Sequence, residues 1–292
     1  MTTENIENTN IREEKQEEKS FFSVIVHSFF IIPFLIAVFC VLLFAGIHLL
    51  THEKKTVFDY LEDVKTGGLT KRWQGAFELS KFLANPTLVS KDKRFSSELI
   101  KAFVQAQHDD NRVRQYLALA MGRTANREFV TPLIDGLRNE KQENLPAVIY
   151  ALGMLKDKRA VRILYPYLDS HEAMVRSITV VSLGNIADPE SKSFIKKGLM
   201  DSEPNVQWGA AISLAQMGDS SGKKILLKLL NRQYLSQFPE VDMDEQNNLI
   251  MTTIDAASHL NDSELINTIR ELSQSDQNMK IRSAALKIAN QK

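Results

Sequence analysis

The sequence contains one cysteine, Cys40, among its 292 residues, and it has no excess of either charge, with 36 basic and 36 acidic residues. A single cysteine cannot close a disulfide within the chain or supply the several thiolates of a cysteine-based zinc site. Both kinds of site are therefore excluded. Nucleic-acid-binding proteins usually carry a basic excess or stripe. Because this chain carries neither, DNA and RNA are not expected partners.

Charge is missing altogether from one stretch, since no Asp, Glu, Lys or Arg occurs between Ser20 and His52. Residues 29–50 read FFIIPFLIAVFCVLLFAGIHLL. As a helix they would be about 33 Å long, enough to cross a hydrocarbon core of about 30 Å. A secretory signal would instead show a basic start, a shorter apolar run and a small-x-small cleavage site. The stretch therefore predicts one uncleaved transmembrane helix.

This helix divides the chain into segments of different character. Residues 1–20 hold three basic and six acidic residues, a net charge of −3, and predict a disordered polar tail. Residues 21–50 form the anchor. Residues 51–70 contain a short amphipathic helix that either caps the following domain or rests on the membrane surface. Residues 71–292 form the main domain, and the chain from Thr51 onward has 33 basic and 30 acidic residues.

The side of the membrane on which the C-terminal domain lies is predicted from the basic residues that flank the apolar segment. Each flank holds three within about 20 residues: Arg12, Lys15 and Lys19 before it, and Lys54, Lys55 and Lys65 after it. The adjacent pair of lysines after the segment lies closest to the hydrocarbon edge. This favours a single-pass protein with its C-terminal domain in the cytoplasm, and the opposite orientation stays open.

The main domain repeats with a period of 31 residues. Four columns of similar residues share this spacing: Met121-Gly122, Leu152-Gly153, Leu183-Gly184 and Leu214-Ala215; Asn126, Asp157, Asp188 and Asp219; Leu133, Leu164, Ile195 and Leu226; Leu137, Leu168, Leu199 and Leu230. Agreement of four independent columns is very improbable by chance. The sequence therefore contains a repeat array.

Each repeat predicts a helical hairpin. Residues 174–186 and 190–200 both have apolar residues at helical spacing. Between them, Asp188 suits an N-cap and Pro189 suits the first position of the next helix. The glycine late in the first helix costs about 1 kcal/mol of helix propensity relative to alanine. Close packing of the neighbouring helix is the expected compensation.

These residues resemble HEAT repeats, in particular the short, PBS-lyase-like subtype with a motif similar to VRxxAAxALGxxxD. The matching segments are Val113-Arg114, Ala151-Leu152-Gly153, Val175-Arg176, Val206-Gln207 and Ala210-Ala211. Leu145, Gln207 and Asn126 depart from the motif. The resemblance covers about 220 residues, from Lys71-Arg72-Trp73 to a last helix around Ile281. It implies an all-α fold, a HEAT-like α-solenoid of about six to seven helical hairpins.

Two insertions interrupt the period, at residues 84–95 and 231–244. Long loops of repeat arrays often lie at a binding face, although a tolerated surface insertion explains them equally well. Trp73 and Trp208 occupy matching places, for which core packing is the simpler interpretation. The arginines of the motif suit either a partner or hydrogen bonds within the array. The candidate partner-binding residues are Trp73, Arg114, Arg176, Trp208, Tyr234 and Phe238.

No catalytic motif is present: the sequence lacks HExxH, GxSxG, Walker-type and GxGxxG patterns. Deoxyhypusine hydroxylase resembles this architecture and binds two irons through His-Glu pairs. This chain has only His52-Glu53, beside the membrane, and His171-Glu172. We therefore expect no catalytic residues, no cofactor and no metal ion.

The favoured function is that of a membrane-anchored, non-enzymatic scaffold or adaptor that binds another protein through its solenoid. A membrane protein complex such as a transporter is the expected partner. Two alternatives remain: an extracytoplasmic envelope-assembly or surface-binding module, and a metal-dependent HEAT-repeat enzyme. The oligomeric state is left open.

Overall fold

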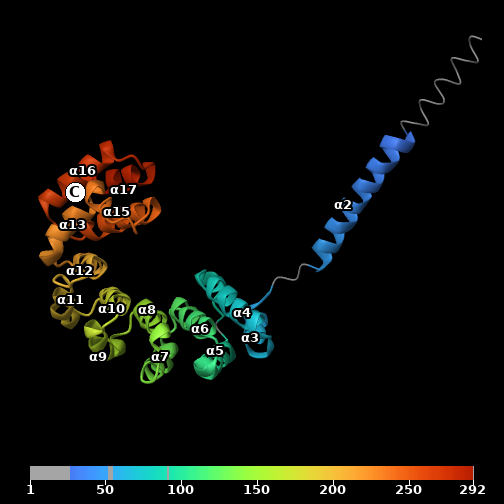
Figure 1. Cartoon of the computed structure of the whole chain (residues 1–292), viewed down its shortest axis with the longest axis horizontal. Helices are drawn as coiled ribbons and strands as arrows, with labels where there is room; N and C mark the ends of the chain where they lie inside the picture. The colour runs from blue at the N-terminus through green and yellow to red at the C-terminus, as the bar shows by residue number, and fades with distance from the viewer. Residues whose placement is uncertain (1–26, 52–54, 91, 292) are drawn as a thin grey trace, which may run out of the picture. The chain divides into compact units, whose positions relative to one another are not determined.

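The computed structural model describes residues 27–51, 55–90 and 92–291 (Figure 1). The chain divides into two compact units, Met1–Lys55 and Thr56–Lys292. The predicted polar tail and the first residues of the predicted anchor lie outside the described residues, as do residues 52–54 of the predicted capping segment. Each unit is described by itself below.

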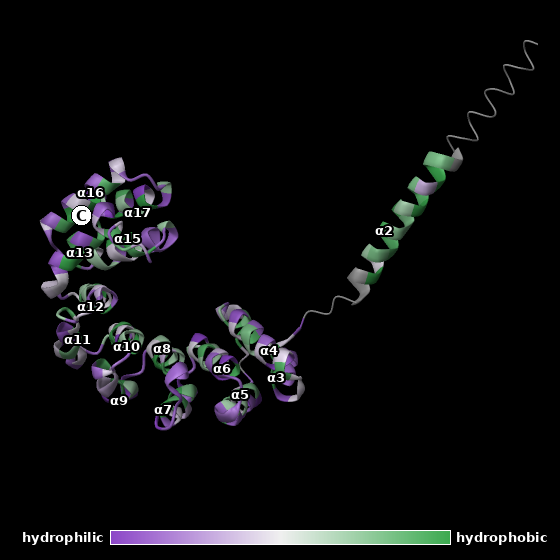
Figure 2. Ribbon diagram, viewed as in Figure 1, coloured by the Kyte–Doolittle hydropathy of each residue, from purple (hydrophilic) through white to green (hydrophobic). Residues whose placement is uncertain are grey.

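The first unit contains a short π-helical turn, His27–Ile31, followed by α2, Ile32–Thr51. Pro33 lies in the first turn of α2, where a missing backbone N–H is tolerated. Large apolar side chains are exposed along the helix, as in Phe34, Phe39 and Phe44, and Figure 2 shows its hydrophobic character. In the part of the chain that is described, it is the one helix long and apolar enough to cross a membrane.

The second unit is the predicted all-α solenoid. It begins with α3, Val57–Thr66, and ends with α17, Met279–Ala289. Six helical hairpins lie between them: α4 (Leu69–Phe82) with α5 (Lys93–Gln105), α6 (Asn111–Arg123) with α7 (Val130–Leu137), α8 (Leu145–Leu155) with α9 (Val161–Leu164), α10 (Ala173–Ile186) with α11 (Lys192–Gly198), α12 (Pro204–Gln216) with α13 (Lys223–Leu229), and α15 (Met243–Ser258) with α16 (Ser263–Ser275). The short helix α14, Arg232–Leu235, precedes the last hairpin.

The first helices of successive hairpins stack directly on one another in chain order. Within this unit, α4, α6, α8, α10 and α12 line the inner side of the curve, and α5, α7, α9 and α11 line the outer side (Figure 1). The stacking changes at the second insertion, because α15 contacts α12 over a shorter stretch. The buried core is likewise divided at α12, whose opposite faces belong to two clusters.

The glycine column explains the close stacking of the first helices. A Cβ atom added at Gly122 would lie 2.8 Å from the Cα atom of Ala151, and one at Gly153 would lie 2.7 Å from the Cα atom of Ser182. Real Cβ atoms do not approach backbone atoms so closely. The predicted role of these glycines in helix packing is confirmed.

The aspartate column forms the corner of each hairpin. The carboxylates of Asp157, Asp188 and Asp219 each accept the backbone N–H two residues later, at 2.9–3.0 Å. Asn126 accepts the same bond at 3.0 Å, which explains why this departure from the motif is tolerated. In all four corners the preceding residue has a positive φ: Ala125, Lys156, Ala187 and Gly218.

Helix α3 covers the N-terminal end of the array. Thr56 and Asp59 form a capping box at its start. Its apolar face, made of Val57, Leu61 and Val64, is buried against the first hairpin. Helix α4 then begins at Leu69, two residues before the start of the repeat domain expected from the sequence.

Candidate binding surface

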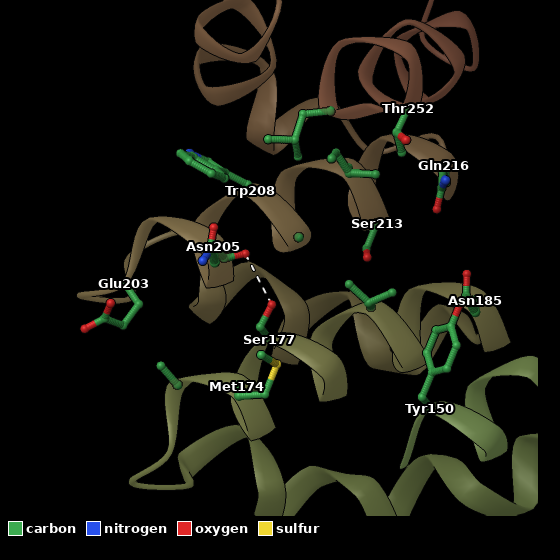
Figure 3. A pocket seen from close by; sticks show the side chains of 15 residues that line it. Tyr150, Met174, Ser177, Asn185, Glu203, Asn205, Trp208, Ser213, Gln216 and Thr252 are labelled. Atoms are coloured by element: carbon green, nitrogen blue, oxygen red, sulfur yellow. Dashed lines mark hydrogen bonds between the residues drawn. The ribbon is translucent and has the colours of Figure 1, made fainter. Parts of the chain in front are cut away.

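The inner side of the second unit contains a groove of about 660 Å³ that crosses α10, α12 and α15 (Figure 3). Each helix contributes residues three or four positions apart, which lie on one helical face. The lining residues are Tyr150 of α8, Met174, Ser177, Val181 and Asn185 of α10, Asn205, Trp208, Ile212, Ser213 and Gln216 of α12, and Leu249 and Thr252 of α15, with Ala173, Glu203 and Gly209.

The groove lining combines apolar residues with uncharged polar ones, such as Ser177, Asn185 and Gln216, and contains one charged residue, Glu203. Met174 is 63% exposed and Tyr150 is 37% exposed, so large apolar side chains face solvent there. The Ser177 hydroxyl donates a 3.4 Å hydrogen bond to the backbone carbonyl of Asn205, which links α10 to the start of α12. A surface of this composition suits contact with another apolar surface.

A second cavity of about 390 Å³ adjoins the groove, because both are lined by Asn205, Trp208 and Leu249. Its remaining lining includes the acidic residues Glu240 and Glu245. The two cavities together are therefore lined by three carboxylates and by no basic residue.

Three of the predicted binding residues form one aromatic cluster at this end of the groove. The ring centroid of Trp208 lies 4.9 Å from that of Phe238 and 6.3 Å from that of Tyr234, both edge-on. The indole N–H donates to the Tyr234 hydroxyl at 3.2 Å. Only 3% of Trp208 is exposed. The cluster thus packs the second insertion onto α12, and its role here is core packing beside the groove.

The second insertion is correspondingly not a free loop. Leu235 of α14 is fully buried, and Val241 is 8% exposed. Arg232 at the start of α14 forms a 2.7 Å ion pair with Asp276, in the turn between α16 and α17. The first insertion also packs against the core, through Phe95, which is buried. The ring centroid of Phe95 lies 6.1 Å from that of Phe58 in α3, in an edge-on arrangement.

Arg176 forms its hydrogen bonds within the array. Its guanidinium forms two 2.8 Å hydrogen bonds with the Asp201 carboxylate and a third with the Ser170 carbonyl. The hydrogen bond with Asp201 raises the pKa of Arg176 above its ordinary value, and the same contact lowers the pKa of Asp201.

Arg114 is engaged in the same manner. It is 2% exposed, pairs with Glu140 at 2.7 Å, and donates to the carbonyl of Phe103. Its guanidinium also lies over the Phe103 ring, 3.5 Å from the centroid. The alternative interpretation of the motif arginines, hydrogen bonding inside the array, is the one that the structure supports.

Gln207 shows why a departure from the motif is tolerated. Its side-chain amide donates to the backbone carbonyl six residues earlier, that of Asp201, at 2.6 Å. Arg176 and Arg282 make the same bond to the carbonyls of Ser170 and Asp276. A glutamine can therefore replace the arginine because one N–H donor is sufficient for this contact.

Trp73 lies on α4, separated from Trp208 of α12 by the first helices α6, α8 and α10. It is partly buried against the core, and the guanidinium of Arg112 lies 4.6 Å from its ring centroid. The structure therefore does not bring Trp73 together with Trp208, although the two residues occupy equivalent positions in their helices.

Sequence reasoning missed Met174, Tyr150, Ile212 and Glu203. The 31-residue repeat could have identified some of them, because residues 31 positions apart occupy the same face of successive first helices. Residues 181 and 212 are one such pair, both apolar and both in the groove.

In the hairpins α10–α11 and α12–α13, basic residues are concentrated in the second helix. The first helices α8, α10, α12 and α15 contain a single basic residue, Arg176, whose charge is paired. The second helices α11 and α13 contain six lysines and no acidic residue. The surface formed by α8, α10, α12 and α15 thus contains no unpaired basic residue, whereas α17, which packs on α15, carries Lys280, Arg282 and Lys287.

The His-Glu pair that the sequence offers as a possible metal ligand, His171-Glu172, lies in the exposed turn before α10. Within residues 27–51, 55–90 and 92–291, no three His, Cys, Asp or Glu side chains are grouped so that they could hold a metal ion. His52-Glu53 falls outside these residues.

Several solved structures contain chains that are similar to this one. The complex of CpcE and CpcF of phycocyanin lyase from Nostoc sp. PCC7120 contains a similar chain, with 19% identity and a TM-score of 0.54, over 82% of this chain and 96% of that one. The archaeal HEAT-like repeats protein from Thermococcus onnurineus NA1 is 16% identical, with a TM-score of 0.42, over 82% and 97%. Human deoxyhypusine hydroxylase is 13% identical, with a TM-score of 0.38, over 81% and 96%.

No curated protein matches the chain in sequence. The family described as HEAT repeats does match, over residues 97–183 and 161–235. These residues include the glycine and aspartate columns and the stacked first helices α6, α8, α10 and α12. Residues 97–235 therefore consist of HEAT repeats, and the second unit is a HEAT-like α-solenoid with the fold of the chain found in the phycocyanin lyase complex.

Proposed function

We propose that this protein is a membrane-anchored, non-enzymatic adaptor that binds another protein in the groove on the inner side of its solenoid. The observation that carries the proposal is the groove itself, a largely uncharged surface formed by α8, α10, α12 and α15, with Met174 and Tyr150 exposed in it. Rigid stacked hairpins present such a surface without a conformational change. The solenoid of phycocyanin lyase, found in a complex of CpcE and CpcF, supports a protein as the ligand.

The anchor in this proposal is α2. Its apolar side chains are exposed around the helix, which water would disfavour and lipid would accept. An anchored adaptor meets partners of the same membrane at an effective concentration in the millimolar range when the geometry allows. A membrane protein complex is therefore the partner that anchoring favours, and the flanking lysines favour a cytoplasmic solenoid.

Site-specific photo-cross-linking of the full chain in its native membranes tests this function. A benzophenone amino acid replaces Met174 in the groove, or Met200, which is 87% exposed outside it, as the matched control. We expect a discrete protein adduct from position 174 that is absent from position 200. Absence of any adduct from position 174, with equal expression of both variants, would refute the adaptor role of the groove.

Protease protection of a C-terminal epitope in sealed vesicles of known orientation tests the topology. Digestion from the cytoplasmic face alone is expected. Digestion from the opposite face alone would reverse the topology and favour the extracytoplasmic envelope-assembly or surface-binding function.

A further inference from the structure

We infer that the partner segment bound in this groove is a cationic amphipathic helix of another protein, an inference that rests on the proposed function and adds the chemistry of the ligand. The groove supplies Met174, Val181, Ile212 and Leu249 as apolar contacts. The carboxylates of Glu203, Glu240 and Glu245 lie at its edge and in the adjoining cavity.

The helical form of the ligand follows from its backbone. A segment that enters the groove leaves water, so its backbone N–H and C=O groups need hydrogen-bond partners. An extended peptide finds them on a sheet edge, and the described residues contain no strand. A helix satisfies these groups internally and presents apolar residues at positions i, i+3, i+4 and i+7.

The positive charge of the ligand follows from charge complementarity. None of the three carboxylates is in an ion pair within the described part of the chain, although Glu245 also accepts the backbone N–H of its capping box. The basic residue nearest to them in the lining helices, Arg176, is paired with Asp201. Lysine or arginine side chains of a bound helix would neutralise these carboxylates, whereas acidic segments would be repelled.

The same charges argue against other occupants. The chain's own residues 1–20 carry a net charge of −3 and would be repelled from an acidic groove. An anionic lipid surface or a nucleic acid would be repelled as well. A second copy could offer the lysines of α11 or α13, and the test below includes that occupant as an outcome.

The experiment measures binding of two designed peptides to the full chain in phosphatidylcholine nanodiscs, with empty nanodiscs as background. Both peptides are amphipathic helices of about five turns with a leucine face; one has lysines and the other glutamates on the polar face. We expect the lysine peptide to bind, with an affinity that falls as salt is raised, and the glutamate peptide not to bind.

The double variant Glu203→Lys/Glu240→Lys should weaken binding of the lysine peptide by at least about tenfold and create binding of the glutamate peptide. The control Asp135→Lys/Glu190→Lys makes the same change of net charge at exposed residues outside the groove and should leave both affinities unchanged. Circular dichroism shows that both variants are folded.

Three results would overturn the inference: equal binding of both peptides to the unmodified chain, no difference between the groove variant and its control, or displacement of the lysine peptide by self-association as protein concentration rises. The proposed function has a separate readout. If position 174 yields a protein adduct in membranes while the lysine peptide fails to bind, the adaptor role stands and the charge inference falls.

Discussion

The guanidinium of Arg176 in α10 donates two hydrogen bonds of 2.8 Å to the carboxylate of Asp201, which lies in the turn before the next repeat. The side chains of both residues are only 14% exposed. Arg72 with Asp109 and Arg114 with Glu140 repeat this arrangement. The pair therefore joins the first helix of one hairpin to the entry of the following one.

Replacing Arg176 by alanine should destabilise the solenoid by about 2–3 kcal/mol, because the partly buried carboxylate of Asp201 loses its partner. Urea unfolding of the full chain and hydrogen exchange in α10–α12 measure this loss. Arg138→Ala is the control, since its contact with Asp135 is 3.9 Å long and exposed, and should change stability by less than about 0.5 kcal/mol. Equal effects of the two changes would contradict the role of the pair.

The corner aspartates predict acid sensitivity. Burial alone would raise the pKa of Asp219, but hydrogen bonds from Lys196 and Ser221 outweigh it and lower this pKa to about 2. Contacts with Arg159 and Lys223 likewise lower the pKa values of Asp157 and Asp262.

A carboxyl group whose pKa is lower in the folded state stabilises that state above its unfolded pKa. This stabilisation is lost as the pH falls through the folded pKa. The melting temperature should therefore be constant above about pH 5 and fall between about pH 4 and pH 2. Asp219→Asn should flatten part of this fall. A melting temperature that rises on acidification would contradict the prediction.

Gly218 has φ +73° and open space around its Cα atom. Gly218→Ala should therefore destabilise the protein by about 1 kcal/mol through backbone strain alone. Ala187, at the equivalent corner, has φ +56°, so Ala187→Gly should relieve strain and be neutral or slightly stabilising. Thermal unfolding of both variants provides the measurement, and a stable Gly218→Ala variant would argue against the left-handed corner.

Gly153→Ala should destabilise the protein by about 1–3 kcal/mol, even though alanine has the better helix propensity. The added methyl group would meet the backbone of Ser182 and force α8 and α10 apart. Ala215 occupies the same column, where the neighbouring first helix follows an insertion, so Ala215→Gly should cost no more than about 1 kcal/mol. Hydrogen exchange at the α8–α10 contact distinguishes local separation of these two helices from global unfolding. Unchanged protection of their amides in Gly153→Ala would rule out the local separation.

If α2 is the anchor, Val38→Arg/Leu42→Arg should release the chain from membranes under alkaline extraction. Each arginine at the centre of a span costs about 2.5–3.5 kcal/mol on insertion. The control Ser193→Arg/Gln237→Arg places the same residues at exposed positions of the second unit, and this variant should remain in the pellet. Full retention of the α2 variant would contradict membrane anchoring by this helix.

The sequence alone determined the repeat, because a hairpin that must stack on copies of itself needs the same small and apolar residues at each period. The spacing of Gly122, Gly153 and Gly184 predicted both the helices and their close contact. The same local logic identified Asp188 as a cap and α2 as a helix long and apolar enough to cross a membrane.

Only the tertiary structure decided which side chains remain available to a partner. The chemistry of Arg176 and Trp208 suits contact with a partner. In the structure, Arg176 forms an ion pair with Asp201, and Trp208 packs against Tyr234 and Phe238. Met174 became a surface residue because stacking leaves the inner face of α10 uncovered. Helical spacing specifies which residues share a face. Whether that face is buried depends on the curvature of the array and on the fold of its insertion, because curvature and insertion packing are set by contacts between residues distant in sequence.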